Sequence, residues 1–175
     1  VLDPGSVNFT HASDLSGGAA DFIYLNPGEH VRAGLHLAKR RAIVPSYAVY
    51  EPGFLRTGAA LAGAIGAPSP VYRFMFSSGF TWGYAPRQWA LDAYLALLAE
   101  EAPGAPWMIA GLDVDILPLA EATVAQGGHL RVGLEDAPFG SELGNETWVQ
   151  RAVAAVTAAG GRPASPDEVR AGKAV

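Results

Sequence analysis

The sequence contains no cysteine, which excludes disulfides, thiolate nucleophiles and thiolate metal ligands. Any metal ion bound by the chain must therefore be held by histidine, aspartate or glutamate. There is also no excess of positive charge, since 12 lysines and arginines stand against 17 aspartates and glutamates, for a net charge of −5. We expect neither a nucleic acid nor a membrane as a partner, because both bind clustered cations. The cytoplasm is the expected compartment.

Long hydrophobic runs are missing too. Charged residues and glycines interrupt every apolar stretch before it reaches the roughly 20 residues that a membrane helix needs. The first residues, Val1-Leu2-Asp3-Pro4, contain neither an initiating methionine nor a signal-peptide pattern, and they read as the interior of a longer protein. No GxGxxG, P-loop or GxSxG motif occurs, so dinucleotide, nucleoside-triphosphate and serine-hydrolase functions have no support. Half of the 175 residues are hydrophobic, which is typical of one globular domain over residues 1–175.

From about Ala42 onward, short β-branched or aromatic runs alternate with longer Ala- and Leu-rich segments, which is the rhythm of βα units. The predicted strands are residues 43–50, 71–76, 107–110 and 129–134, and the predicted helices are 54–65, 86–101, 116–126 and 146–159, with Asn145 as the N-cap of the last. Ahead of these we expect an extended piece at 2–9, a loop at 10–19, a strand at 22–25 and a helix at 27–41. Ser165-Pro166-Asp167-Glu168 predicts a short helix at 165–172, because it places a cap, an N1 proline and first-turn acids in order.

The pattern gives about five strands whose connections all carry helices, and thus a mostly parallel sheet. Two α/β architectures fit. One is an open doubly wound sheet, and the other is a (β/α)8 barrel of the TIM type, of which this chain would hold only the C-terminal five or so βα units. Both are built from the same repeated unit, so the pattern alone does not separate them.

Ligands bind at the carboxyl ends of the strands in either architecture, and the residues after each strand are therefore the site candidates. The richest position is Arg131-Val132-Gly133-Leu134-Glu135-Asp136. Strand alternation puts Arg131 and Glu135 on one face, where a metal ligand would lie beside a cation that orients an anionic substrate. An alternative is that Glu135 and Asp136 pair with Arg131 and cap the following loop, and the spacing does not decide between the two.

The four histidines do not form a metal-binding pattern. His30 and His36 are six residues apart on a predicted helix and point to different faces, His11 lies in a loop, and His129 opens a strand. No pair has the i, i+2 or i, i+4 spacing of a metal site. The sequence therefore offers one carboxylate ligand, Glu135, without imidazoles to accompany it.

Two further segments supply substrate-binding candidates. The loop at 77–85 begins at Ser77; its small residues permit close backbone approach and its aromatics can wall a pocket, although it can equally be a packed loop over the sheet edge. In Gly5-Ser6-Val7-Asn8-Phe9, the alternation puts Ser6 and Asn8 on one side of an extended segment, where both can hydrogen-bond a substrate carbonyl.

Four segments taken together resemble the β-keto acid cleavage enzymes. Residues 127–136, Gly-Gly-His-Leu-Arg-Val-Gly-Leu-Glu-Asp, are close to the family's GGHxRVGLED motif. Three more segments agree in order and spacing: 5–9 with GSxNF, 107–117 with WxxAGxxxxxLP, and 162–167 with RPATPxE. The resemblance covers nearly the whole chain.

The resemblance implies a (β/α) barrel that uses a divalent metal, usually zinc, to convert a β-keto acid and acetyl-CoA into acetoacetate and a shorter acyl-CoA. By motif position it implies that Glu135 is a metal ligand, and that Arg131 and Asp136 steer proton transfer and bind the substrate carboxylate. Ser6 and Asn8 correspond to substrate contacts. Family members also tend to be homo-oligomers.

Two departures from the family pattern stand out. The family's H-x-H metal motif is absent from this sequence, as are the three strands expected before Gly5. Where many members have Pro-Glu-x-Glu, this chain has Pro45-Ser46-Tyr47-Ala48, so Glu51 is the acidic residue expected to take over part of the missing glutamate's role. The loop from Ser77 also differs, and we expect a different acyl preference.

Two other hypotheses remain. One is a degenerate or truncated barrel without catalysis, which serves as a binding or assembly subunit. The other is a Schiff-base aldolase, which has little support because Lys39 lies on a predicted helix and Lys173 in the tail, and neither is at a strand end.

Overall fold

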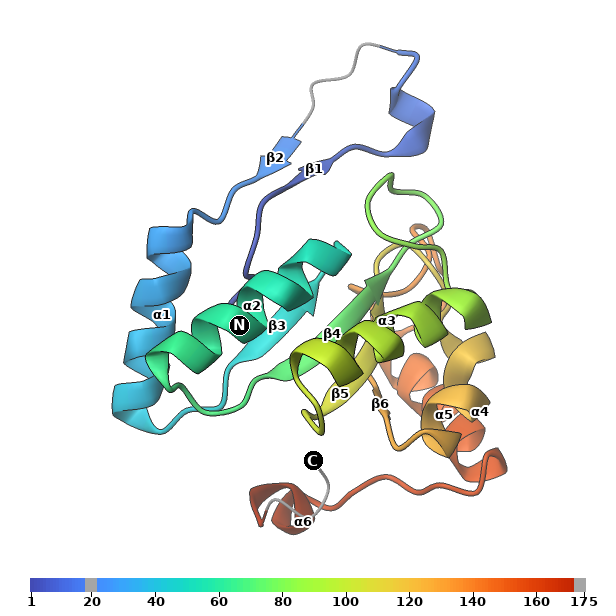
Figure 1. Ribbon diagram of the computed structural model, residues 1–175. Helices are drawn as coiled ribbons and strands as arrows, with labels where there is room; N and C mark the ends of the chain where they lie inside the picture. The colour runs from blue at the N-terminus through green and yellow to red at the C-terminus, as the bar shows by residue number, and fades with distance from the viewer. Residues whose placement is uncertain (18–21, 172–175) are drawn as a thin grey trace.

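A parallel sheet forms the centre of the protein in the computed structural model, which describes residues 1–17 and 22–171 (Figure 1). Its four strands lie in the order β3-β4-β5-β6. Their bounds are Ser46–Val49 for β3, Val71–Phe76 for β4, Trp107–Gly111 for β5 and His129–Leu130 for β6. Each neighbouring pair is parallel. The prediction of an α/β protein with a parallel sheet is confirmed.

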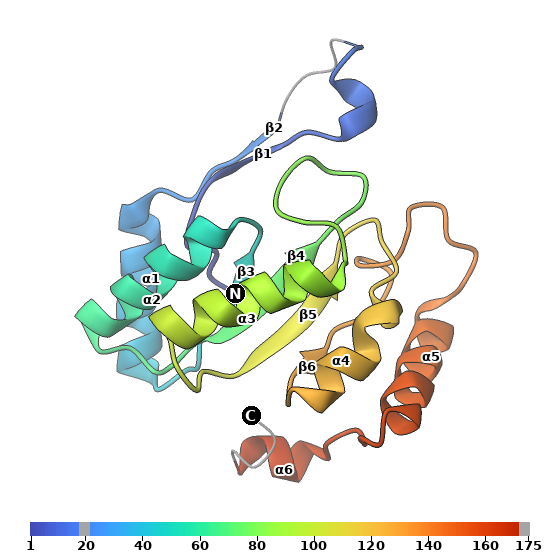
Figure 2. The same cartoon turned by 45° about the vertical axis from the view of Figure 1, so that its right-hand side comes forward.

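Helices follow each of these strands, as the alternating sequence pattern predicts. They are α2 (Pro52–Ile65), α3 (Gln88–Glu101), α4 (Ala120–Ala125) and α5 (Asn145–Ala158). α2 and α3 lie side by side over one face of the sheet, while α4 and α5 pack on each other beside β6 (Figure 2). Before β3 comes α1 (Gly28–Arg41), which packs on α2, and near the C-terminus lies α6 (Pro166–Arg170).

Some boundaries differ from the predicted ones for local reasons. The strand predicted at 129–134 ends at Leu130, because the chain turns at Gly133, whose φ is 155°, and Asp136 N donates to Gly133 O. The helix predicted at 116–126 is split into a 3-10 turn at Leu117–Leu119 and α4. α5 begins at Asn145 itself, so its N-cap is Gly144 and not Asn145 as predicted.

The C-terminal helix was predicted from its capping residues, and that prediction is confirmed. Ser165 Oγ accepts a hydrogen bond from Glu168 N, and the Glu168 carboxylate accepts one from Ser165 N. This capping box satisfies two backbone donors at the helix start. The end of the predicted range, residue 172, lies outside the described residues.

An antiparallel pair of strands projects from the body near the N-terminus (Figure 1). β1 (Val7–Phe9) pairs with β2 (Phe22–Tyr24), and Phe9 makes edge contacts with both Phe22 and Tyr24. The strand predicted at 22–25 therefore forms, but it pairs antiparallel with β1 and does not join the parallel sheet as predicted. The described part of the connection contains a 3-10 turn, Ala12–Asp14, within the segment predicted as a loop. The cross-strand aromatic contacts favour the antiparallel pairing. The end of the loop predicted at 10–19 falls outside the described residues.

The segment before β1 continues the sheet beyond β3. Leu2 N donates to Ser46 O at 2.9 Å, and Ala48 N donates to the Asp3 carboxylate at 2.8 Å. These bonds use N–H and C=O groups on the β3 edge, so residues 2–4 lie where a further strand would lie. The N-terminal segment is thereby brought beside the central sheet.

The two faces of the sheet have different cores. On the helix side, Tyr47, Phe74 and Ile109 are fully buried under α2 and α3. The opposite face, which we call the inner face, contains a smaller cluster of Ala48, Met75, Ala110 and Trp82. The register puts Ala48 beside Arg73 and Met75 beside Ala110, and Arg73 and Met75 share a face because they are two residues apart on β4. Trp82 joins this cluster from the loop after β4.

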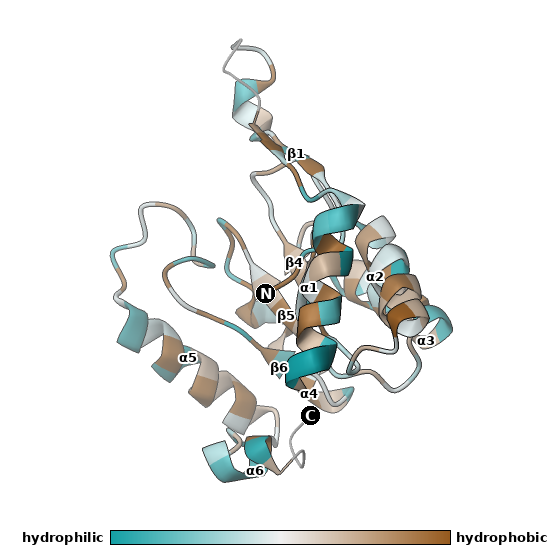
Figure 3. Ribbon diagram, turned by 90° about the vertical axis from the view of Figure 1, so that its left-hand side faces the viewer, coloured by the Kyte–Doolittle hydropathy of each residue, from teal (hydrophilic) through white to brown (hydrophobic). Residues whose placement is uncertain are grey.

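The sheet is open within the described residues, because β6 is paired only on its β5 side. A groove of about 570 Å³ lies beside it, lined by Leu130 of β6 and by Val149, Val153 and Val156 of α5. Figure 3 shows bands of hydrophobic residues along α5 between hydrophilic ones. We call this feature the β6 groove. A closed barrel of this type needs eight strands, whereas the described residues form a parallel sheet of four, so no barrel closure is seen.

No helix in the described ranges combines the length and the hydrophobicity that crossing a membrane requires.

Candidate functional site

Arg131 and Asp136 form the most tightly connected polar pair at the carboxyl end of the sheet. Arg131 Nε and Nη2 both donate to Asp136 Oδ1, at 3.0 and 2.8 Å. The backbone N–H of Gly111, the last residue of β5, donates to the same oxygen at 3.2 Å. One carboxylate oxygen therefore joins the end of β5 to the chain after β6.

Burial raises the pKa of Asp136 above its ordinary value, while hydrogen bonds from Arg131 and Gly111 act in the opposite direction. The side chain is buried, and the structure records no donor to its Oδ2 from the described residues. A carboxyl group in such a setting suits the exchange of a proton with a ligand.

Glu135 differs sharply from its neighbour. Its side chain is 74% exposed, and its Oε2 lies 3.2 Å from Arg131 Nη2. Both carboxylates thus pair with Arg131, as one of the two interpretations of the sequence expected. The exposed Glu135 carboxylate retains oxygens for another ligand, whereas the Oδ1 atom of Asp136 is fully occupied.

The residues present do not complete a metal site. Among the described residues no group of three histidine, cysteine, aspartate or glutamate side chains lies close enough to hold a metal ion. His129 is half-buried, and burial lowers its pKa, so it stays neutral to lower pH. Glu135 is therefore a single candidate ligand.

A second polar group lies on the inner face of the sheet, and the sequence reading missed it. Arg73 points to this face from the middle of β4, with its Nη2 4.0 Å from Asp3 Oδ1. Asp3 Oδ2 accepts a hydrogen bond from Tyr24 at 2.7 Å. Burial, together with the charges or hydroxyls of Asp3, Tyr24 and Glu135, raises the pKa of Tyr50 to about 12, while Arg73 acts in the opposite direction. These charges are therefore close enough to act on one another.

A signal for Arg73 was present in the sequence. Val71–Phe76 is apolar except for one arginine, and an arginine inside a buried strand is costly unless it has a function or a partner. Asp3 and Tyr50 gave no comparable signal, because only the folding of residues 2–4 along β3 brings them near Arg73.

The predicted substrate contacts on the N-terminal segment are not brought to Arg131. Ser6 Oγ accepts a hydrogen bond from Asn26 N at 2.8 Å, and Asn8 is exposed on β1 opposite Ile23. Val7 and Phe9, which alternate with them, pack on the inner-face cluster instead. The side chains of Ser6 and Asn8 therefore lie on the other side of this segment.

The remaining predicted contacts hold the loop after β4. Ser77 is buried, and its Oγ accepts from Gly79 N and Phe80 N at 3.2 and 3.1 Å. Glu51 Oε1 accepts from Gly83 N at 3.2 Å. Trp82 of this loop packs against Phe9 and Tyr50 on the inner face. The structure thus shows the packed form of the loop that was one of the two predicted alternatives.

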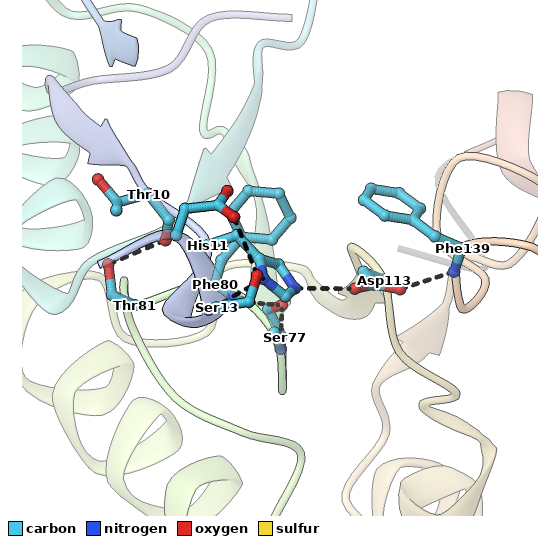
Figure 4. Close-up of polar contacts among 10 residues, drawn as sticks. Thr10, His11, Ser13, Ser77, Phe80, Thr81, Asp113 and Phe139 are labelled. Atoms are coloured by element: carbon cyan, nitrogen blue, oxygen red, sulfur yellow. Dashed lines mark hydrogen bonds and ion pairs between the residues drawn. The ribbon is translucent and has the colours of Figure 1, made fainter. Parts of the chain in front are cut away.

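Three loops meet at the rim of the site through His11, Asp113 and Phe139, and we call this set of contacts the clasp (Figure 4). Asp113 follows β5. Its Oδ2 atom lies 3.4 Å from His11 Nε2, and its Oδ1 atom accepts a hydrogen bond from Phe139 N at 2.6 Å. Asp113 has a φ of 58°, a left-handed conformation that is uncommon without glycine. Ser13 and His11 Nδ1 are 2.7 Å apart. The clasp joins segments far apart in sequence, so spacing gave no sign of it.

Comparisons with known proteins agree with this local pattern. The chain is 26% identical over 175 residues to the 3-keto-5-aminohexanoate cleavage enzyme of Fusobacterium nucleatum subsp. nucleatum. The alignment covers 97% of this chain and 58% of that relative, so the chain spans less than two thirds of the relative's length.

The chain also matches a protein family as a whole. The sequence pattern of the beta-keto acid cleavage enzymes matches residues 1–172, which include the central sheet, its helices, and the Arg131–Asp136 pair at the sheet's edge. On this evidence the chain belongs to the beta-keto acid cleavage enzyme family.

Proposed function

We propose that this chain supplies the arginine–carboxylate part of the active site of a metal-dependent β-keto acid cleavage enzyme. The reaction would condense a β-keto acid with acetyl-CoA to give acetoacetate and a shorter acyl-CoA. The observation that carries the proposal is the Arg131–Asp136–Glu135 cluster at the sheet's carboxyl edge, in a chain that belongs to this family.

Arg131 and Asp136 would act as a unit on the substrate. The guanidinium binds a carboxylate in two-point fashion, and its remaining N–H groups are available for that purpose. Asp136, whose pKa is raised by burial, would hold and transfer the proton that enolate chemistry requires. The fixed geometry around Asp136 Oδ1 orients both side chains.

Ser6, Asn8, Glu51 and Ser77 remain proposed substrate contacts. The oxygens of Ser6 and Ser77 already accept backbone hydrogen bonds. A hydroxyl still has one proton to donate, so each can bind a substrate carbonyl without losing those bonds.

For the metal we propose zinc, with Glu135 as the ligand from this chain. Bound zinc would polarise the keto carbonyl as a Lewis acid. A catalytic zinc site usually has three protein ligands, and the described residues hold no such group, so the other donors would have to lie outside them.

At the scale of the fold, we propose that residues 1–175 form one domain, the C-terminal five or so βα units of a (β/α)8 barrel. The match to 58% of the relative's length supports this, as does the unpaired edge of β6. We also propose that the protein is a homo-oligomer, as the members of its family tend to be.

The name of the relative specifies a keto acid that bears an amino group. We do not propose that substrate for this chain, because Arg73 and Arg131 both lie on the inner face and would repel an ammonium group. The neighbourhood of Arg73 favours an anionic or neutral acyl chain instead.

The test uses the full-length protein with zinc, acetyl-CoA and a panel of β-keto acids, and measures acetoacetate. Glu135→Gln and Asp136→Asn should each lower kcat by about 100-fold or more. Only Glu135→Gln should also reduce the zinc content measured after dialysis. Asp167→Asn, on the exposed surface of α6, is the control. Full activity and full zinc content in Glu135→Gln would contradict the metal assignment.

A second function has one observation in its favour, namely that Glu135 is exposed and is joined by no metal-binding group in the described chain. A protein of this kind would serve as a binding or assembly subunit without catalysis. Turnover by the 175-residue chain, together with one zinc per chain, would exclude it.

A further inference from the structure

Arg73 is the charged residue whose surroundings fit its chemistry least. It is only 7% exposed, and it makes no hydrogen bond within the described part of the chain. Its Nε is fully buried and unpartnered. A guanidinium has five N–H donors, and burying them without acceptors is strongly unfavourable. A buried cation in this state needs an acceptor that the described residues do not provide.

Asp3 does not meet that need. Its nearest approach to Arg73 is 4.0 Å, which exceeds hydrogen-bond distance. Asp3 Oδ1 accepts from Ala48 N, and Oδ2 accepts from the hydroxyl of Tyr24. Asp3 therefore offsets part of the charge of Arg73, while its oxygens are directed to other donors.

The sheet geometry aims Arg73 at the same face as Arg131. Arg73 aligns with Met108 on β5, and Met108 aligns with His129 on β6, two residues before Arg131. Side chains two apart on a strand share a face, and the rise is roughly 7 Å over two residues. Arg73 thus lies one layer deeper in the sheet than Arg131.

Electrostatics agrees with this placement. Burial lowers the pKa of Arg73, and the charge of Arg131 lowers it further, whereas Asp3, Tyr50 and Glu135 raise it. Arg131 has Asp136 and Glu135 as hydrogen-bonded or close partners. Of the two guanidinium groups, Arg73 is the one that has no hydrogen-bonded acceptor among the described residues.

One side of the inner face remains accessible. Met75 and Ala110 are buried beneath the loop after β4, but Met108, His129 and Arg131 are partly exposed. A ligand that reaches Arg73 from Arg131 would lie along Met108. The planar guanidinium matches a carboxylate, which can accept two parallel N–H bonds.

We propose that Arg73 binds a second carboxylate of the substrate, so that the site selects short β-keto acids with a carboxylate at each end. This rests on the proposed function, which places the keto acid's own carboxylate at Arg131. The other end of the acyl chain then reaches the deeper arginine. Loss of either carboxylate leaves Arg73 or Arg131 without its ligand.

The proposal is tested by direct binding to the full-length protein, without turnover. Glutarate, with two carboxylates, and butyrate, with one, are titrated by calorimetry into the wild type and into Arg73→Met, Arg73→Lys and Arg56→Met. Arg56 is an exposed arginine of α2 that pairs with Glu101, and it serves as the matched control. Thermal unfolding verifies that each variant is folded.

The wild type should prefer glutarate by about tenfold or more, the worth of one charge-assisted hydrogen-bond pair. Arg73→Met should lose that preference while butyrate affinity is unchanged, Arg73→Lys should keep part of it, and Arg56→Met should keep all of it. If Arg73→Met does not fold, the preference of the wild type and its partial retention in Arg73→Lys decide the matter.

Equal affinity of the wild type for both acids overturns the proposal, and so does an equal loss of both in Arg73→Met. A structure of the full-length protein in which an acidic side chain hydrogen-bonds Arg73 overturns it as well. Acetoacetate formation is assayed separately. An Arg73-dependent glutarate preference in a protein that makes no acetoacetate would support the anion site and contradict the proposed function.

Discussion

Two adjacent carboxylates, Glu135 and Asp136, have opposite environments although both contact Arg131. Asp136 is buried and accepts three hydrogen bonds on one oxygen, whereas Glu135 is largely exposed. A buried charge pair contributes little net stability when intact, but removing one member leaves the other uncompensated. Substitution of Asp136 should therefore lower the stability of the protein, whereas substitution of the exposed Glu135 should change stability little.

Asp136→Ala should lower the free energy of unfolding by about 2–3 kcal/mol, because Gly111 N and the Arg131 guanidinium lose their acceptor. Urea denaturation followed by circular dichroism measures the change. Asp167→Ala, on the exposed surface of α6, should stay within about 0.5 kcal/mol. Equal effects of the two substitutions would contradict a structural role for the Asp136 pair.

His129 should make stability fall in mild acid. Burial lowers its pKa below the ordinary value of 6.5, so the unfolded chain binds the proton more readily than the folded one. Above pH 6.5 both states are neutral and the residue has no effect; as pH falls below 6.5, the free energy of unfolding decreases. His129→Gln should flatten this slope between pH 7 and pH 5 in urea titrations.

His30→Gln is the control for that experiment, since His30 is exposed on α1. A pH profile unchanged by His129→Gln, or flattened equally by His30→Gln, would contradict the role of His129.

At this scale the sequence predicted part of the candidate site. Arg131, Glu135 and Asp136 were found because they are adjacent and follow a strand, and the structure brings them together. Arg73 and Asp113 were missed, because their partners come from distant segments whose approach depends on tertiary structure. Local spacing carries no information about such pairs.

The elements themselves followed local chemistry closely. The helix predicted at 54–65 ends at Ile65 as expected, and Gly66, with a φ of 66°, caps it in the left-handed conformation. The capping box of α6 was equally readable. The β1–β2 pair was not, because antiparallel and parallel strands have the same side-chain alternation and only cross-strand contacts decide between them.

Two glycines at the C-terminal end of α2, Gly63 inside the helix and Gly66 just after it, should respond to alanine in opposite directions. Gly66→Ala should destabilise the protein by about 1 kcal/mol, because alanine resists a positive φ. Gly63→Ala should stabilise it by about 0.5–1 kcal/mol, because Gly63 is in the helix and a Cβ there meets no atom within 4 Å. Melting temperatures measured side by side give the signs, and shifts in the same direction would contradict this account.

Over the whole molecule, the parallel α/β arrangement was predictable and closure was not. Repeated βα units specify parallel strands, but an open sheet and an arc of a barrel share that unit. Within residues 1–17 and 22–171, β6 has an unpaired edge beside the β6 groove, and this edge distinguishes the sheet from a closed barrel.

That edge should make the 175-residue chain self-associate. Unpaired strand edges and exposed apolar side chains favour pairing between molecules. Val153→Glu places a charge in the β6 groove and should shift sedimentation velocity profiles toward the monomer. Val44→Glu changes an exposed valine outside the groove and is the control. A wild-type chain that sediments as a monomer at all concentrations would contradict the prediction.

The clasp at Asp113 has a consequence for exchanging parts between relatives. Loops on α/β scaffolds can often be grafted one at a time, because each is anchored only by its own strand and helix. Here Asp113 is bonded to the backbone of Phe139 and lies beside His11, and a Cβ at Gly79 would be 2.3 Å from His11 Nε2. A graft at any of these loops therefore has to bring the others with it, and chimeras of this scaffold should be assembled by swapping the rim as one unit.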